Sequence, residues 1–328
     1  MSKNLLSIVA LIVGIGMAPF LLSDYGVSLA TEILIMSIFA VSLGMIMGYA
    51  GMVSFGHAAF FGIGAYTVAL LGEKIPSVYA LILLSILITA VVALISGAVF
   101  IRTSNFSFLM ITLAFGQLLF ALAWKMEHWT GGADGIKVSA YLDFGFGEIY
   151  SPLGLYYTMA IAFILVYLLL RAFVNSPAGK ITKGIMENES RMKALGYNVR
   201  IYKLIAYCFS GAIAGFGGSL YAYFNLFVSP DLTHWTLSGQ VMLMVIIGGV
   251  GTLLGPFIGA GVFIVLQNFI STYTERWPLI MGILLVALVL IGKGGVIHWF
   301  GLAGKHLKKR EKPELEAATQ PLKKEVAK

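Results

Sequence analysis

Long apolar runs separated by short polar segments dominate the pattern along this chain. Most runs contain about 20 residues, the length that an α-helix needs to cross the hydrocarbon core of a bilayer. A transmembrane β-barrel would instead show short segments of alternating polarity. The pattern therefore predicts an all-α, polytopic transmembrane helical bundle with about eight to ten spans. The apolar runs are Leu5–Leu22, Val27–Gly48, Met52–Leu71, Val78–Ile101, Phe106–Trp124, Pro152–Phe173, Leu204–Phe224, Leu237–Val250, Leu254–Thr272 and Pro278–Gly292.

Three of these runs have a second interpretation. Met52–Leu71 is rich in glycine and Leu237–Val250 is short, so each is open to being a re-entrant or broken helix. The run Leu5–Leu22 has the features of a signal peptide, with a cleavage site at residues 28–30 as the alternative to a span. Its long apolar core favours a span that is retained.

The composition supports a membrane protein. Hydrophobic residues make up 59% of the chain and charged residues only 11%, whereas soluble domains carry about 25% charged residues. So few charges do not cover a surface that faces water. The single cysteine, Cys208, excludes a disulfide bond within the chain.

The positions of the cations predict an orientation. Lysine and arginine gather in the segment Asn175–Lys203 and in the tail after residue 304, whereas the loop Lys125–Ser151 leans acidic. An even number of spans places both basic segments on one face, and the positive-inside rule makes that face cytoplasmic, with both termini inside. No basic domain with interleaved aromatic residues accompanies them, so we expect no nucleic-acid partner.

This pattern divides the chain into a transmembrane domain over residues 1–304 and a basic, disordered cytoplasmic tail over residues 305–328. Anionic lipid headgroups are a generic partner for such a tail.

The apolar runs contain few chemically active groups. Glu32 is the carboxylate within a run and His57 is the histidine, so a proton relay would depend on these two alone. A structural interpretation is favoured for both residues: a position at the membrane interface for Glu32 and a hydrogen bond between helices for His57. The sequence shows no catalytic motif, no metal-ligand spacing and no cofactor site. Gly179-Lys180 lacks the rest of a P-loop, so any ATP must bind to another chain.

Glycines recur at a helical spacing of four residues. Gly44 and Gly48 form one such pair, Gly211 and Gly215 form another, and a double stripe follows at residues 251, 255 and 259. In a membrane this spacing lets helix backbones approach closely. We expect these stripes to pack helices together.

The segment Asn175–Lys203 is too polar to cross a membrane but has features of a helix. Pro177 suits the first helical turn, Gly196 suits the helix end, and Glu187 and Arg191 form an i,i+4 pair. Such a helix between two spans lies on the membrane surface or docks a partner, and its residues alone favour neither.

Four segments together resemble the permease subunits of the branched-chain amino acid (Leu/Ile/Val-type) ABC importers, over roughly residues 32–292. The polar loop after Thr130 resembles the M-type permease more than its H-type partner. The segments are GYAGMVSFGHAAFFGIGAY (residues 48–66), TGGADGI (residues 130–136), SPAGKITKGIMENESRMKALGYNVRIYKLIAY (residues 176–207) and IIGGVGTLLGPFIGA (residues 246–260).

The resemblance implies a multi-pass subunit of a bacterial or archaeal plasma membrane that is itself not an enzyme. It implies a homologous second permease subunit, two cytoplasmic ATPase subunits and an extracytoplasmic binding protein that delivers the amino acid. The polar segment between spans is then the coupling loop that contacts the ATPase. Residues 190–192 depart from the general spacing of that motif, which leaves the individual docking residues open. The residues that match the family's version are Glu187, Asn188, Glu189, Ala194, Leu195 and Gly196.

The resemblance also places a second group of residues in the translocation path or in helix packing. They are Ser54, Phe55, Gly56, His57, Gly248, Gly249 and Gly251.

Three alternatives compete with an importer of branched-chain amino acids. Permeases of the same family for urea, amides or other amino acids look alike at this level. A gradient-driven secondary transporter would use Glu32 and His57. A membrane-embedded enzyme would need a cluster of reactive polar groups, and the sequence shows none.

Overall fold

The computed structural model describes residues 13–103, 106–145 and 147–291. Within these ranges the chain is an all-α bundle, as the apolar runs predict, with one short pair of strands. Residues 13–21 are helical. The other elements are α2 (Asp24–Tyr49), α3 (His57–Leu71), α4 (Val78–Phe100), α5 (Phe106–Lys125), α6 (Glu127–Thr130), η1 (Gly132–Asp134), β1 (Ile136–Lys137), α7 (Pro152–Asn175), α8 (Pro177–Glu187), α9 (Glu189–Ala194), α10 (Val199–Asn225), β2 (Phe227–Val228), η2 (Pro230–Thr233), α11 (Trp235–Gly248), α12 (Gly255–Tyr273) and α13 (Trp277–Ile291).

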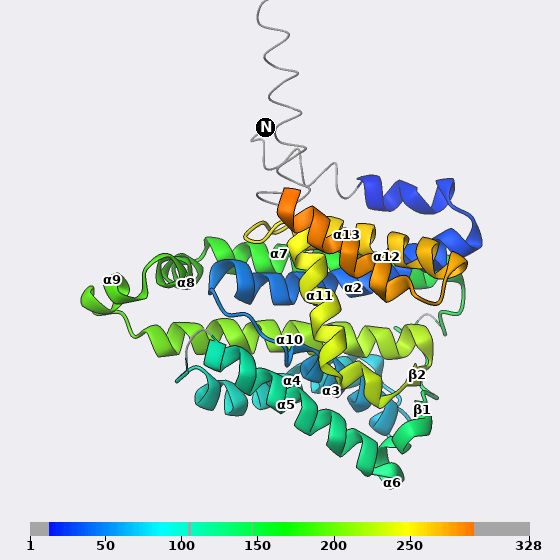
Figure 1. Ribbon diagram of the computed structural model, residues 1–328. Coiled ribbons are helices and arrows are strands. Elements are labelled where there is room, and N and C mark those ends of the chain that lie inside the picture. Colours follow the sequence, from blue (N-terminus) through cyan, green and yellow to red (C-terminus); the bar gives the residue numbers. More distant parts are fainter. Residues whose placement is uncertain (1–12, 104–105, 146, 292–328) are drawn as a thin grey trace, which may run out of the picture.

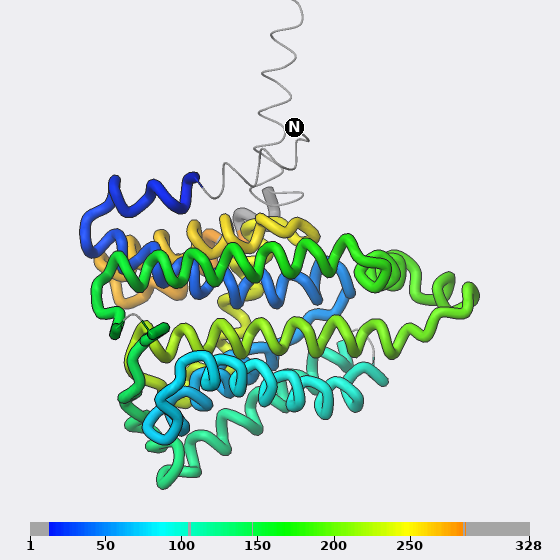
Figure 2. Tube along the Cα trace, turned by 180° about the vertical axis from the view of Figure 1, so that it is seen from behind, coloured from blue at the N-terminus to red at the C-terminus, as the bar shows by residue number. Residues whose placement is uncertain are grey.

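Six of the described helices are long and apolar enough to cross a membrane: α2, α4, α5, α7, α10 and α12. Helix α10 lies at the centre and packs against α2, α3 and α4 (Figure 1). Seen from behind, α7 lies over α2, and α8 with α9 joins α7 to α10 (Figure 2). The bundle thus has two layers that share α10.

The two weak apolar runs become short helices that start inside the bundle. Residues 53–56 form no helix, and α3 begins at the fully buried His57. A Cβ atom added at Gly51 would lie 3.1 Å from Met186 of α8, whereas one at Gly72 would lie 2.7 Å from Ala140 at the other end of the bundle. Residues 51–72 therefore cross the bundle as a broken span, and the alternative of a re-entrant segment does not apply here.

Helix α11 is the second short helix, at 14 residues. The ring of Trp235 at its start lies 6.1 Å from that of Phe55, and its Ser238 hydroxyl accepts a hydrogen bond from the backbone N–H of Ala58 at 2.8 Å. The buried N–H of Ala58 in the first turn of α3 is thus satisfied by a protein group. Irregular backbone at membrane depth is tolerated only where it is buried in this way.

The basic and the acidic-leaning loops lie at opposite ends of the bundle (Figure 1). Helices α8 and α9 protrude beyond α7 and α10 at one end. At the other end, Ile136 of β1 pairs with Val228 of β2 in antiparallel register, and Ser139 donates a hydrogen bond to Glu73 at 3.2 Å.

Glycines let the central helices approach each other. A Cβ atom at Gly218 of α10 would overlap the carbonyl oxygen of Phe61 in α3, and one at Gly64 of α3 would overlap the carbonyl oxygen of Gly215. A Cβ atom at Gly44 would lie 2.7 Å from Pro256 of α12. Backbones this close gain dispersion contacts along the whole interface.

One of the expected glycine stripes is shorter than the spacing suggested. Gly251 has a φ of 86° and lies in the turn before α12, which starts at Gly255. Only Gly255 and Gly259 therefore share a helix. Gly251 serves the turn instead, because an L-residue with a side chain is strained at that positive φ.

We predict that Gly218→Ala destabilises the protein by about 1–3 kcal/mol, because its methyl group would be forced into the backbone of α3. The matched control is Gly282→Ala in α13, where a Cβ atom meets nothing within 4 Å. Helix propensity alone favours alanine at both positions, so the control should be at least as stable as the parent. Thermal unfolding in detergent measures both, and equal behaviour of the two variants would contradict the close approach.

Candidate functional site: the α8–α9 segment and the buried His57 cluster

The polar segment between α7 and α10 forms two helices rather than the single helix that its pattern suggested. The hydroxyl of Ser176 caps α8 by accepting from the N–H of Gly179 at 3.2 Å, and Pro177 occupies the first turn. Asn188 then adopts an extended conformation, with φ −159° and ψ 96°. Its side chain accepts from the N–H of Arg191 at 2.9 Å and so caps α9. The sequence missed this break because an asparagine tolerates a helix interior but prefers a cap.

The break also changes the ion pairs. The expected pair of Glu187 and Arg191 is not among the salt bridges of the described residues. Glu189 instead contacts Lys193 and Lys203, each with an N–O distance of 2.7 Å. Its hydrogen bonds to these two lysines, Lys193 first, hold the pKa of the Glu189 carboxyl below its usual value. Because Lys203 belongs to α10 and its side chain is only 15% exposed, this contact ties α9 to a central helix.

Helix α8 is held on the bundle by buried residues, whereas α9 is held by the ion pair of Glu189 with Lys203. Gly179, Thr182 and Ile185 of α8 are buried, and Gly179 lies against the backbone of Phe173 and Val174. Helix α9 buries none of its residues. The exposed positions among the predicted coupling residues are Glu187, Asn188, Ala194, Leu195 and Gly196.

The tip of this segment carries an apolar side chain in solvent. Leu195 is 66% exposed, and Gly196 follows it with a φ of 87°. A turn at that φ suits glycine and ends α9 in the left-handed conformation. A single exposed leucine is ordinary on a protein surface, so it is the protrusion of this charged segment that suits contact with a partner.

His57 lies in a fully buried cluster at the centre of the bundle. Its Nε2 atom is 3.0 Å from the hydroxyl of Ser42 in α2 and 3.2 Å from that of Ser210 in α10. The ring stacks on Phe39 at 5.7 Å and meets the edge of Phe60 at 5.7 Å. The first turn of α3 is thereby joined to both α2 and α10.

The hydrogen bonds that the two serine hydroxyls donate bear on which nitrogen of the His57 imidazole carries the proton. Ser42 donates its hydrogen to the carbonyl of Phe39 at 2.7 Å, and Ser210 donates to the carbonyl of Ser42 at 2.6 Å. With the hydroxyl hydrogens assigned in this way, both oxygens accept from His57, and this assignment places the proton on Nε2. Nδ1 is left as a buried acceptor without a hydrogen-bond partner among the described residues. The result is a neutral histidine in a structural contact, with no carboxylate to exchange a proton.

The other predicted path residues fall into two groups. Near His57, Ser54 is buried, Phe55 donates its N–H to Thr112 at 3.3 Å, and Gly56 lies against the carbonyl of Thr112. The second group lies further along α2, where a Cβ atom at Gly48 would touch Gly251. The remaining members of that group are Gly248, which packs on Gly255, and Gly249, which has a φ of 109°.

Sequence reasoning did not find Ser42, Ser210, Ser238, Thr112 or Lys203. Each is a single polar residue on a helix, and only the packing shows which group it meets. Among the residues that the structure covers, no three histidine, cysteine, aspartate or glutamate side chains are placed to hold a metal ion.

The family profile described as branched-chain amino acid transport system / permease component matches residues 26–291, which is most of the chain. The chain belongs to this permease family. Together with its six long apolar helices, this makes it a multi-pass membrane protein of a transport family.

Individual relatives agree with this membership. The high-affinity branched-chain amino acid transport system permease proteins LivM of Salmonella typhimurium and Escherichia coli are each 27% identical over 319 residues, covering 90% of this chain and 75% of theirs. The tyrosine transport system permease protein of Clostridioides difficile is 26% identical over 267 residues, covering 81% of this chain and 86% of its own. No solved structure matches the chain.

We predict that His57→Ala destabilises this permease by about 2–5 kcal/mol, the range for emptying a buried site, because it removes a ring that joins three helices. His128→Ala, at an exposed position, is the control and should leave stability unchanged. Chemical unfolding in mixed micelles measures both. Transport lost in His57→Ala with full stability would instead indicate a chemical role.

We predict that Glu189→Gln loosens α9, because Lys203 loses its charged partner. Amide hydrogen exchange over residues 189–203 should become faster than in the parent and in the control Glu275→Gln. Since the pKa of Glu189 is lowered from 4.5, its stabilising contribution is present above that value and is lost as the pH falls through the lowered pKa. Acidification of the parent should therefore lower the protection factors of these amides, which correct for the intrinsic pH dependence of exchange, and protection factors that do not change with pH would contradict the prediction.

Proposed function

We propose that this chain is a permease subunit of an ATP-driven ABC importer that translocates branched-chain amino acids delivered by an extracytoplasmic binding protein. The observation that carries the proposal is the α8–α9 segment, which protrudes from an apolar bundle and ends in an exposed leucine. The family membership supports the transport role. ATP hydrolysis takes place on two separate ATPase chains, and a homologous second permease completes the path.

The contacts of α8 and α9 support their role as the coupling element. The exposed residues of α9 and its tip face the ATPase, while Ile185 and its buried neighbours hold α8 on the bundle. Glu189 passes a displacement of α9 to Lys203 and hence to α10. Because α10 packs on α2, α3 and α4, a shift of its first turn reaches the centre of the bundle.

The charge distribution supports the orientation. The end with α8 and α9 carries most of the cations of the described loops and is cytoplasmic by the positive-inside rule. The opposite end, with β1, β2 and the acidic-leaning loop, then faces the binding protein. Both termini lie in the cytoplasm of a bacterial or archaeal cell, and the membrane is its plasma membrane.

The interior argues against a gradient-driven transporter. Glu32 and Ser42 are both on α2, ten residues apart, which is about 15 Å along a helix. His57 contacts Ser42 and not Glu32. The two ionisable groups that a proton relay would need are therefore separated by apolar side chains. Energy supplied by ATP in another chain needs no such relay.

The substrate is argued from the named relatives. The two LivM proteins, which cover 90% of this chain, are named for branched-chain amino acids. The relative from Clostridioides difficile, which covers 81%, is named for tyrosine. Branched-chain amino acids are our proposal. Tyrosine, other amino acids, urea and amides are the alternatives that the same architecture can carry, because the binding protein selects the substrate.

We predict that labelled leucine enters transport-deficient cells only when this chain is expressed with its partner permease, ATPases and binding protein, and that Gly196→Pro abolishes this uptake. Proline fixes φ near −65°, whereas Gly196 has a φ of 87°. The matched control is Gly196→Asn, because asparagine tolerates a positive φ and a Cβ atom at this position meets nothing within 4 Å. It should retain most of the uptake.

Assembly of each variant is checked by co-purification with the ATPases. Full uptake by an assembled Gly196→Pro complex would refute the coupling role of α8 and α9. Uptake of tyrosine or urea in place of leucine would keep the architecture and replace the substrate. Leucine flux driven by an ion gradient through this chain alone would refute the importer.

A further inference from the structure

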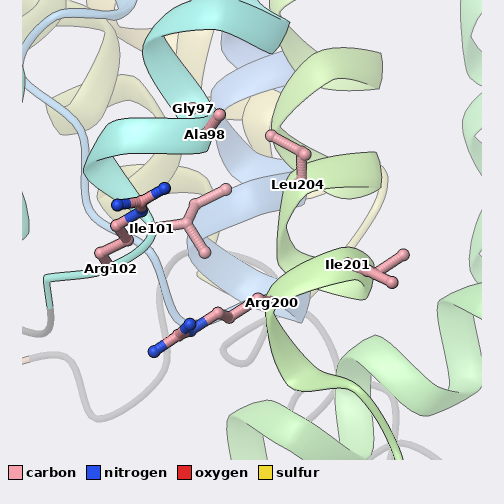
Figure 3. A pocket seen from close by; sticks show the side chains of 7 residues that line it. All are labelled: Gly97, Ala98, Ile101, Arg102, Arg200, Ile201 and Leu204. Atoms are coloured by element: carbon pink, nitrogen blue, oxygen red, sulfur yellow. The ribbon is translucent and has the colours of Figure 1, made fainter.

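A groove between the end of α4 and the start of α10 is not used by the proposed transport mechanism. It has a volume of about 180 Å³ and lies near the end of the bundle that carries α8 and α9. Figure 3 shows Arg200 reaching from α10 toward the end of α4, where Arg102 lies. Apart from the two arginines, the residues that line the groove are apolar or small. The lining residues are Gly97, Ala98, Ile101, Arg102, Arg200, Ile201 and Leu204.

The two arginines of this groove have no carboxylate partner in the part of the chain that the structure covers. The salt bridges found there both belong to Glu189, which pairs with Lys193 and Lys203. Both Arg102 and Arg200 are exposed. Two like charges on neighbouring helix ends repel each other unless an anion lies between them.

The floor of the groove is closed by tight helix packing. A Cβ atom at Gly97 would lie 2.7 Å from a ring carbon of Tyr207 and 2.9 Å from a methyl carbon of Leu204. Ile101 is buried beside them. The groove therefore does not lead into the bundle. It opens on the outer surface of the bundle, beside the exposed residues of α4 and α10.

An exposed apolar stripe continues from the groove along α4. Val91, Leu94 and Ala98 precede Arg102 at helical spacing and share its face. Val91 and Leu94 are each about half exposed, at 53% and 49%. On α10, Ile201 and Ile205 form a second exposed pair beside Arg200. A ligand of this groove thus meets cations at one end and about two turns of apolar surface at the other.

We propose that this groove binds an anionic phospholipid of the leaflet on the α8–α9 side, with its phosphate between Arg102 and Arg200 and an acyl chain along α4. Arginine binds phosphate oxygens through paired N–H donors. Basic pockets between transmembrane helices on the cytoplasmic side suit anionic headgroups. The site does not depend on which substrate is transported, although its leaflet follows the orientation proposed above.

A lipid explains the groove better than a soluble anion or a protein. A soluble phosphate would use the arginines but leave the stripe of Val91 and Leu94 without a partner. We expect a surface that docks a protein to carry charges of both signs, as the surface around Glu189 does. The lining of this groove carries cations and apolar side chains only. The bound phosphate would hold the first turn of α10 against α4, three residues from Lys203.

The test uses the assembled transporter, purified in mild detergent and titrated with phosphatidylglycerol or phosphatidylcholine under native mass spectrometry. Removal of both charges in Arg102→Gln/Arg200→Gln should weaken phosphatidylglycerol binding about twenty-five-fold, at about fivefold for each arginine. Phosphatidylcholine binding should change less. The matched control, Arg276→Gln, replaces an exposed arginine outside the groove and should bind phosphatidylglycerol like the parent.

A second variant tests the acyl part of the site. Ala98→Trp fills the exposed wall of the groove, leaves both arginines in place and should also weaken phosphatidylglycerol binding. Unchanged affinity in the double arginine variant would overturn the proposal. So would displacement of the lipid by millimolar inorganic phosphate, which would indicate a soluble-anion site. Absence of bound phosphatidylglycerol from the parent complex would overturn it as well, because another subunit would then cover the groove.

Discussion

The close approach of α10 to its neighbours is the constraint on which the rest of this structure depends. Gly218 faces the backbone of α3 and Gly215 faces the side chain of Thr89 in α4, and any side chain at either glycine would separate the helices. Within a membrane, helix association gains little from the hydrophobic effect, because lipid tails are as apolar as leucine. Contact between backbones therefore takes over that role. The buried hydroxyls of Ser210 and Ser42 can meet His57 only because the helices lie this close.

The same helix joins the surface segment to the interior. Helix α10 begins next to α9, holds Glu189 through Lys203, and ends at β2 on the far side of the bundle. The broken span α3 starts beside the middle part of α10, where His57 meets Ser210, and the N–H of Ala58 is satisfied by the Ser238 hydroxyl of α11. The breaks before α3 and α11 interrupt the regular helices of the bundle. Those interruptions are the positions in this bundle where backbone groups have fewest helical partners.

The buried histidine illustrates how burial limits chemistry. His57 donates through Nε2 and has no carboxylate neighbour to take up a proton, and its ring is enclosed by Phe39 and Phe60. An active base needs access to a substrate or to water, together with a partner that changes its charge. The hydrogen-bond partners of this ring among the described residues are the hydroxyls of Ser42 and Ser210. These contacts fit the positioning of helices.

The sequence by itself determined the all-α membrane class, the apolar helices, the family resemblance and the polar segment between α7 and α10, because these follow from local polarity, length and motif. It did not determine the break at Asn188, since capping and helix-interior roles differ by small energies for asparagine. The i,i+4 spacing predicted an ion pair between Glu187 and Arg191. In the structure it is Glu189 that forms an ion pair, with Lys203 of the next helix. Only the tertiary structure decided such contacts, because a single serine, lysine or glycine on an apolar helix carries no sign of the residue that packing will bring against it.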